Sequence, residues 1–221
     1  VLLAGNYTLE GTAGNDTLKA GSGDNEIRPY AGINAVDAGA GNDTVLWGPN
    51  VSTTDWQLQR APTSFLSGVD TTTTPVTYAV KGSYEGGAGL DTLHFKMDGN
   101  FQYSHDGLSS WMSSTPMSYQ LDLTSATISN FETLKLTTGS YSYGPESINL
   151  SAAQLSGLSE LSGVNVAVKG GGTVDLSAIT LTEDAAVLFS VNDDYTVSGT
   201  AAADNIMTYA GSDTITGGDG S

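Results

Sequence analysis

Hydrophobic and polar positions repeat with a period of nine residues between Gly11 and Leu46. The units GTAGNDTLK, AGSGDNEIR, PYAGINAVD and AGAGNDTVL share glycine at position four, an aliphatic residue at position eight, and Asp or Asn at position six. Positions seven to nine predict a short strand with its single apolar side chain pointing inward, and the first six residues predict a turn. Two units predict one coil of a parallel stack. Asp16 is therefore expected to face Asn34, and Asn25 to face Asp43, in the next coil.

The same nine-residue register returns at three other places in the chain. Residues 2–10 fit it with Tyr7 at position six, and residues 86–94 (GGAGLDTLH) fit it with Asp91. Residues 190–216 resume the register, with Asp204 and Asp213 at position six of their units. Four in-register units with aliphatic residues at one fixed position are not what a flexible glycine-rich linker would show.

The stretches between these units have a different pattern. Residues 47–85 lose the register and hold several aromatic residues and prolines. Alternating apolar positions and β-branched residues predict strands, and Trp47 and Phe131 are expected in the core because each continues a strand pattern. A short helix is expected over 148–155, with Ser151 as its N-cap. The predicted strands cover 76–80, 119–136, 164–168, 173–176, 179–182 and 186–191.

The nine-residue units resemble the calcium-binding nonapeptide G-G-x-G-x-D-x-U-x of RTX proteins. Carboxylate, amide and turn carbonyl oxygens are the ligands that Ca²⁺ requires. The resemblance implies several calcium ions, and an Asp–Asn pair is expected to bind more weakly than an Asp–Asp pair. The predicted metal-ligating residues are Asp16, Asn25, Asn34, Asp43, Asp91, Asp204 and Asp213, with Asp24 and the turn glycines Gly14, Gly23, Gly32 and Gly41.

A wider resemblance joins GGAGLDTL to the later strings ISNFETLKL and INLSAAQL, and this arrangement is similar to that of large secreted bacterial RTX adhesins. It implies an all-β fold, in which an RTX parallel β-roll or β-solenoid frame carries an inserted, irregular, β-rich ligand-binding region. We expect one composite domain cut from a longer chain. Its predicted segments are an N-terminal roll (1–46), an aromatic excursion (47–85), a single nonapeptide (86–94), the inserted region (95–189) and C-terminal repeats (190–221).

Composition and charge limit the classes of molecule that this chain is expected to bind. The chain of 221 residues has a net charge of −17, from 24 acidic and 7 basic residues, which argues against nucleic acid and anionic membranes. It has no cysteine, so calcium would replace disulfides as the stabilising cross-link. No apolar run is long enough for a membrane helix, and no membrane insertion is expected. The resemblance implies an extracellular or cell-surface location, type I secretion and a monomeric module within a larger adhesin.

Catalytic chemistry has little support in the sequence. The two histidines, His94 and His105, do not form an H-E-x-x-H motif, and no G-x-S-x-G motif appears. The acidic pairs Glu183-Asp184 and Asp193-Asp194 lack an accompanying nucleophile and are expected in turns or as extra cation ligands. We therefore expect no enzyme, although a polysaccharide-modifying module stays an alternative.

Aromatic residues in serine-rich loops are the better candidates for ligand contact, because Tyr and Trp are enriched in binding hot spots. The expected function is calcium-dependent adhesion, as in biofilm or host attachment, through a peptide with a free carboxylate or a glycan on another cell. A calcium ion with an open coordination position would bind the ligand's oxygens. The alternative is a structural spacer or an ice-contacting roll. The candidate ligand-binding residues are Tyr103, His105, Trp111, Tyr119, Tyr141, Tyr143 and the basic Arg60.

Overall fold

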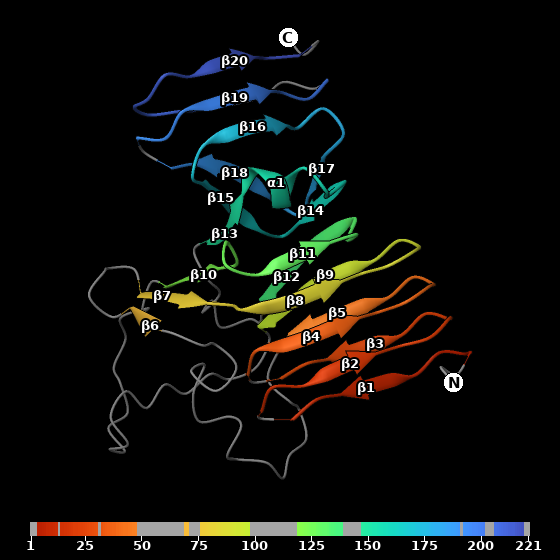
Figure 1. Cartoon of the computed structure of the whole chain (residues 1–221). Helices are drawn as coiled ribbons and strands as arrows, with labels where there is room; N and C mark the ends of the chain where they lie inside the picture. The colour runs from red at the N-terminus through yellow and green to blue at the C-terminus, as the bar shows by residue number, and fades with distance from the viewer. Residues whose placement is uncertain are drawn as a thin grey trace.

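The chain forms a stack of parallel β-coils (Figure 1). The structure is a computed structural model and describes residues 4–12, 14–30, 32–47, 69–70, 76–97, 119–138, 147–190, 192–201 and 206–218. About half of the chain is strand, which confirms the all-β fold predicted from the nonapeptides. The N- and C-termini lie at opposite ends of the stack.

The first sheet runs from the N-terminal end of the stack to β17, and all of its strand pairs are parallel. Strands from the nonapeptides and strands from the predicted inserted region are neighbours in it, since β5 and β12 both pair with β9. In spatial order its strands are β1 (Thr8–Glu10), β3 (Glu26–Arg28), β5 (Thr44–Trp47), β9 (Thr92–Met97), β12 (Thr133–Thr138), β14 (Glu160–Ser162) and β17 (Thr180–Thr182).

The second sheet covers another side of the stack, and only its edge strand β6 is antiparallel to its neighbour. In spatial order its strands are β18 (Ala186–Phe189), β15 (Asn165–Lys169), β13 (Ser147–Ser151), β10 (Tyr119–Asp122), β7 (Val76–Ala79) and β6 (Val69–Asp70).

Two shorter sheets complete the described strands. The third sheet has the order β11 (Thr127–Ser129), β8 (Gly82–Glu85), β4 (Asn34–Asp37) and β2 (Thr17–Lys19). The fourth sheet has the order β16 (Gly172–Asp175), β19 (Tyr195–Ser198) and β20 (Thr214–Thr216). In chain order three of the central coils visit the second sheet, then the third or fourth, then the first (β7–β8–β9, β10–β11–β12 and β15–β16–β17).

The nonapeptide register is confirmed by the strand pairing. Leu9 pairs with Ile27, and Leu18 pairs with Val36, so that each coil of the N-terminal roll advances by eighteen residues. The eighth-position side chains therefore stack directly on one another and form the roll's narrow core. From β7 to β17 each coil has a third side, which is formed by a strand or, in one coil, by a short helix, and this widens the stack.

Helix α1 (Ala152–Leu155) takes the place of a strand in one coil, between β13 and β14. Ser151 is its N-cap, as predicted: the Ser151 hydroxyl accepts a hydrogen bond from Gln154 N–H at 3.3 Å, and Gln154 Oε1 accepts one from Ser151 N–H at 2.8 Å. The predicted start at residue 148 is wrong, because 148–151 belong to β13. Ile148 and Leu150 point inward there, between β10 and β15.

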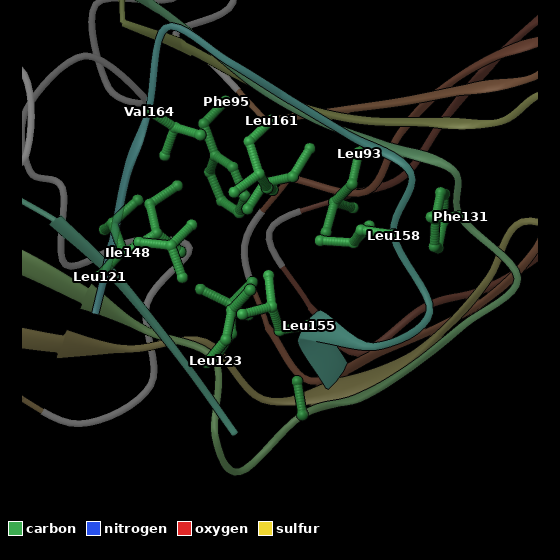
Figure 2. Packing of buried hydrophobic residues seen from close by; sticks show 14 of the residues in the cluster. Leu93, Phe95, Leu121, Leu123, Phe131, Ile148, Leu155, Leu158, Leu161 and Val164 are labelled. Carbon is green, nitrogen blue, oxygen red and sulfur yellow. The ribbon is translucent and has the colours of Figure 1, made fainter. Parts of the chain in front are cut away.

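The core is continuous from the roll into the wider coils. Figure 2 shows Leu93 and Leu161 from the first sheet, Ile148 from the second, and Leu155 from α1 converging on the same interior. Trp47 is buried against Phe95, with parallel rings 5.1 Å apart. Phe131 is also buried, so both aromatic residues expected in the core are found there. Among the described residues, no helix has the length and apolarity needed to cross a membrane.

Candidate calcium centre

The sixth-position side chains form a ladder along one edge of the stack. Asn25 Oδ1 accepts a hydrogen bond from Tyr7 N–H at 3.2 Å, and Asp43 Oδ1 accepts one from Asn25 N–H at 2.7 Å. Asp91 Oδ1 accepts from Asp43 N–H at 2.7 Å in the same way. Asn25 therefore faces Asp43, as predicted. The fourth member, Asp91, continues the ladder across a sequence separation of 48 residues.

The fifth-position side chains form a second ladder that runs in the opposite direction. Asn6 Oδ1 accepts from Asp24 N–H at 2.9 Å, Asp24 Oδ1 from Asn42 N–H at 2.8 Å, and Asn42 Oδ1 from Leu90 N–H at 3.0 Å. This ladder was not predicted as a unit. Its sequence signal is the Asn or Asp directly before position six in several repeats. The hydrogen bonds of the two ladders therefore hold the turns in register without a bound ion.

Asp43 and Asp91 are the two buried carboxylates of the site, exposed by 1% and 0%. In each, Oδ1 accepts the backbone hydrogen bond while Oδ2 is buried without a hydrogen-bond partner. Burial raises the pKa of both groups, and that of Asp91 reaches about 6 because the negative charges of Asp43, Glu132 and Glu85 add to the burial. A buried carboxylate with an unsatisfied oxygen is costly unless a cation or a donor meets it.

Glycine lets neighbouring turns approach closely at this edge. Gly89 has a φ of +147°, and a Cβ at this position would lie 1.9 Å from Gly41 O. Gly41 has a φ of +128°, and its Cβ would lie 2.5 Å from Gly23 O. Any other residue would separate the turns, so glycine is required here to bring carbonyl oxygens of one coil beside the next.

The arrangement fits a calcium ion between the Asp43 and Asp91 turns. Two carboxylate oxygens without partners are available, and calcium takes six to eight oxygen ligands, with main-chain carbonyls among them. Within the described ranges, no three Asp, Glu or His side chains gather as a metal cluster, so the turn carbonyls would supply the remaining ligands. Both side chains here are carboxylates, whereas each of the two pairs predicted for the first roll, Asp16–Asn34 and Asn25–Asp43, combines a carboxylate with an amide.

In the neighbouring turn, the Asn25 side chain makes hydrogen bonds through its amide group. Asn25 Nδ2 donates to Gly23 O at 2.6 Å and to Asp43 Oδ1 at 2.9 Å, so that the amide lies between two oxygens. The Asn25 amide therefore joins a main-chain oxygen and a carboxylate oxygen, which a bound cation would otherwise do. On this turn, amide hydrogen bonds replace part of the interaction with an ion.

The opposite edge of the roll carries Asp16 and Asn34, which face one another as predicted. Asn34 Oδ1 accepts from Asp16 N–H at 2.9 Å, and Asn34 Nδ2 donates to Pro29 O at 3.2 Å. The Asp16 carboxylate turns toward its own loop, where Oδ2 accepts from Thr12 N–H at 2.7 Å and Oδ1 from Thr12 Oγ1 at 3.1 Å. Both carboxylate oxygens of Asp16 therefore accept hydrogen bonds, whereas Oδ2 of Asp43 and Oδ2 of Asp91 have no partner.

The other predicted ligands of the metal sites are placed as follows. Asp213 Oδ1 accepts from Tyr195 N–H at 2.9 Å, which repeats the sixth-position contact in the C-terminal repeats. Asp204 lies outside the described residues. Gly23 and Gly32 have positive φ and stack on Gly5 and Gly14 of the coils before them.

The predicted ligand-binding residues fall almost wholly outside the described part of the chain. The structure places the backbone of Tyr119 at the start of β10. The candidates beyond the described ranges are Arg60, Tyr103, His105, Trp111, Tyr141 and Tyr143. Their roles stay predictions.

The structure places the residues that were considered for catalysis in turns and on one strand. Glu183 and Asp184 form the positive-φ turn between β17 and β18, and Asp194 Oδ1 accepts from Ser212 N–H at 2.7 Å. His94 Nε2 lies 2.8 Å from Thr137 Oγ1 on the first sheet. His94 lies within β9, which continues to Met97.

Comparison with known proteins bears on these repeats. The model of the family described as the RTX calcium-binding nonapeptide repeat (4 copies) matches residues 4–36, 28–46 and 196–221. The chain therefore contains RTX repeats, and calcium is their cofactor. Searches of curated proteins and of solved structures found no match. The matched ranges include Asp43 and Asp213. Asp91 lies outside them, and the fold places it next to Asp43.

Proposed function

We propose that this chain is a calcium-dependent ligand-binding module of a secreted bacterial RTX adhesin. RTX repeats bind calcium, and the buried carboxylates of Asp43 and Asp91 support a fold that depends on it. The module would attach the cell to a peptide with a free carboxylate or to a glycan on another surface. It would act by binding and without catalysis, as one monomeric unit of a longer adhesin.

One topological observation carries the binding role. The three longest breaks in the described coils follow β5, β9 and β12, which are adjacent strands of the first sheet. The chain then continues at β7, β10 and β13, which are adjacent strands of the second sheet; the edge strand β6, which pairs with β7, lies within the first excursion. All three excursions therefore start and finish at the same corner. In the next two coils this corner is crossed by short turns at 163–164 and 183–185.

Because these strands are adjacent, the three segments that hold most of the predicted ligand-binding residues begin close to one another. Neighbouring strands lie about 4.8 Å apart, so three successive excursions leave the stack within about 10 Å of one another. Their sequences hold Arg60, Trp111 and Tyr143 among the candidates. A uniform spacer would have no reason to interrupt three successive coils at one corner with aromatic-rich sequence.

The ice-contacting alternative has less support. It needs a flat, repeated threonine array, and the register does align Thr44, Thr92 and Thr133 on the first sheet. The neighbouring row of the same face is Leu46, His94 and Lys135, which breaks the array. The outer face of the first sheet therefore has no second row of threonines beside the first.

A peptide and glycan array at millimolar calcium tests the proposal. Trp111→Ala and Tyr143→Ala are expected to lose binding while keeping the calcium-dependent melting temperature. Tyr209→Ala is the matched control, because Tyr209 is 61% exposed in the C-terminal repeats, away from this corner. Unchanged binding of every array ligand to both variants would place the site elsewhere. Export is tested by locating the parent protein, and a cytosolic parent chain would contradict type I secretion.

A further inference from the structure

The sixth-position ladder does not end at Asp91. Asp91 N–H donates a hydrogen bond to Glu132 Oε2 at 2.7 Å, which is the contact that Asp43 N–H makes with Asp91 one coil earlier. Glu132 directly precedes the first-sheet strand β12, as Asp91 directly precedes β9 and Asp43 directly precedes β5. The ladder therefore contains a third consecutive carboxylate, and this one lies outside the matched nonapeptide repeats.

The turn that carries Glu132 is shorter than a nonapeptide turn. Residues 86–91 join β8 to β9, whereas only residues 130–132 join β11 to β12. The short turn begins with Asn130, which has a φ of +54°, and the next side chain, Phe131, is buried in the core. Glutamate is one methylene group longer than aspartate, so its carboxylate can make the same contact from a turn with fewer residues.

Gly86 lets these two turns approach closely. A Cβ at Gly86 would lie 1.9 Å from Asn130 O and 2.9 Å from Asp91 Cβ, so no residue with a side chain fits there. The Asn130 carbonyl group therefore lies beside the Asp91 side chain. It accepts no hydrogen bond from the residues that the structure describes, which leaves a main-chain oxygen available as a ligand.

The carboxylates near Asp91 differ in which oxygens are already used. Both oxygens of Glu85 accept hydrogen bonds, one from Ser129 Oγ and the other from Asn130 Nδ2. Glu132 accepts through Oε2 alone, and its Oε1 has no donor in the described part of the chain. Asp91 is 0% exposed, and its Oδ2 has no partner. Neither Asp91 nor Glu132 forms an ion pair with a described lysine or arginine, so their charges stay unbalanced.

We propose that a second calcium ion binds between the Asp91 and Glu132 turns, beyond the nonapeptide repeats. Asp91 and Glu132 are its carboxylate ligands, and Asn130 O is one of its main-chain ligands. Calcium suits this set because it takes carboxylate and carbonyl oxygens in variable geometry, whereas magnesium requires a near-ideal octahedron. The described residues gather no cluster of three acids, so each ion has two carboxylates and Asp91 is a ligand of both.

This second ion joins the last nonapeptide to the first coil that has none. Asp91 precedes β9, Glu132 belongs to the coil of β10, β11 and β12, and residues 98–118 connect the two coils in the sequence. Calcium thus holds together the two coils between which the second excursion runs. The site lies at the turns before the first sheet, so it does not depend on whether the excursions bind a peptide or a glycan.

Glu132→Gln tests the site, because a glutamine oxygen can still accept the Asp91 N–H while the charge is removed. Equilibrium dialysis of the full chain should show one calcium ion fewer, and the calcium-induced rise in Tm should shrink by roughly 5–10 °C. Without calcium, Tm should rise slightly, because Glu132 no longer repels Asp91. A residue that only supports the turn would lower Tm under both conditions.

Glu160→Gln is the matched control. Glu160 lies on β14, one coil further along the first sheet, and its Oε1 already accepts a hydrogen bond from Thr182 Oγ1 at 3.0 Å. This variant should bind as many calcium ions as the unaltered chain.

A double variant separates the second ion from the first. Asp43→Ala should remove the ion between the Asp43 and Asp91 turns, so Asp43→Ala with Glu132→Gln should lose one ion more than Asp43→Ala alone. The proposal is overturned if the double variant loses no more than Asp43→Ala, if Glu132→Gln binds the full number of ions, or if Glu160→Gln loses as many. None of these measurements involves array binding, so failure of this site and failure of the adhesive role are distinguishable.

Discussion

The Asn25 turn and the Asp91 turn occupy equivalent places on one edge of the roll, but they are held by different chemistry. Each accepts the backbone N–H of the preceding coil through one side-chain oxygen. Asn25 then uses its amide to donate to Gly23 O and Asp43 Oδ1, whereas Asp91 has a buried oxygen without a partner. The amide therefore satisfies its turn without an ion, whereas the carboxylate leaves one buried oxygen for a cation. We expect calcium dependence to be greatest where two carboxylates stack.

The largest expected effect follows from removing calcium or its ligands at the Asp43–Asp91 turns. One site saturated at a hundred times its Kd stabilises the fold by about 2.7 kcal/mol, or roughly 5–10 °C in Tm for a chain of this size. Calcium removal should lower Tm by at least this amount. Asp43→Ala and Asp91→Ala should abolish most of the calcium-dependent rise measured by circular dichroism. Asp70→Ala, outside the register, is the control, and an equal loss there would contradict the assignment.

The second prediction concerns a substitution that gives the Asn25 turn the carboxylate found at the Asp91 turn. Asn25→Asp removes the amide donor and places a carboxylate beside Asp43, so Tm without calcium should fall by several degrees. The new Asp–Asp pair should bind calcium more tightly than the Asn–Asp pair does, so saturating calcium should restore most of the loss. Calorimetric titration and paired melts measure both effects. A variant that is less stable by the same amount with and without calcium would show that the amide is not exchangeable for an ion.

A third prediction concerns pH. In the calcium-free protein the pKa of Asp91 is about 6, above the value of about 3.9 for an unfolded chain. The native state then binds this proton more readily, so lowering the pH from 7 to 5 stabilises the calcium-free fold through Asp91. Protons also compete with calcium, so the calcium-induced rise in Tm should shrink over the same interval. Asp91→Asn should remove both trends in melts of dialysed protein, and trends that persist would point to other groups.

The smallest effect is expected at Asp16. Both of its oxygens accept hydrogen bonds from Thr12, so Asp16→Ala should cost about 1 kcal/mol in the free energy of unfolding. Its effect on calcium affinity should be smaller than that of Asp91→Ala, although both residues hold position six of a repeat. Titration of the two variants side by side makes the comparison. A loss at Asp16 as large as that at Asp91 would mean that its carboxylate turns to the ion when calcium binds.

The sequence predicted what depends on local pattern. The eighteen-residue coil, the facing of Asn25 and Asp43, the N-cap at Ser151 and the burial of Trp47 follow from spacing and residue type. The pairing of Asp43 with Asp91 was missed, because 47–85 separates two turns that stack directly. The likeness of AGAGND to GGAGLD was the available signal. The first turn of the expected helix was wrong because burial between two strands outweighed helix propensity at Ile148 and Leu150.

The parallel stacking of coils, with the two ends of the chain at opposite ends of the stack, has a mechanical consequence (Figure 1). Tension between the ends acts along the hydrogen bonds between coils, which then break a few at a time as each coil peels from the next. Such a stack lengthens gradually under load instead of failing at once. An ion shared by the Asp43 and Asp91 turns would join two coils and act as a local clamp, so calcium would set the force at which peeling stops.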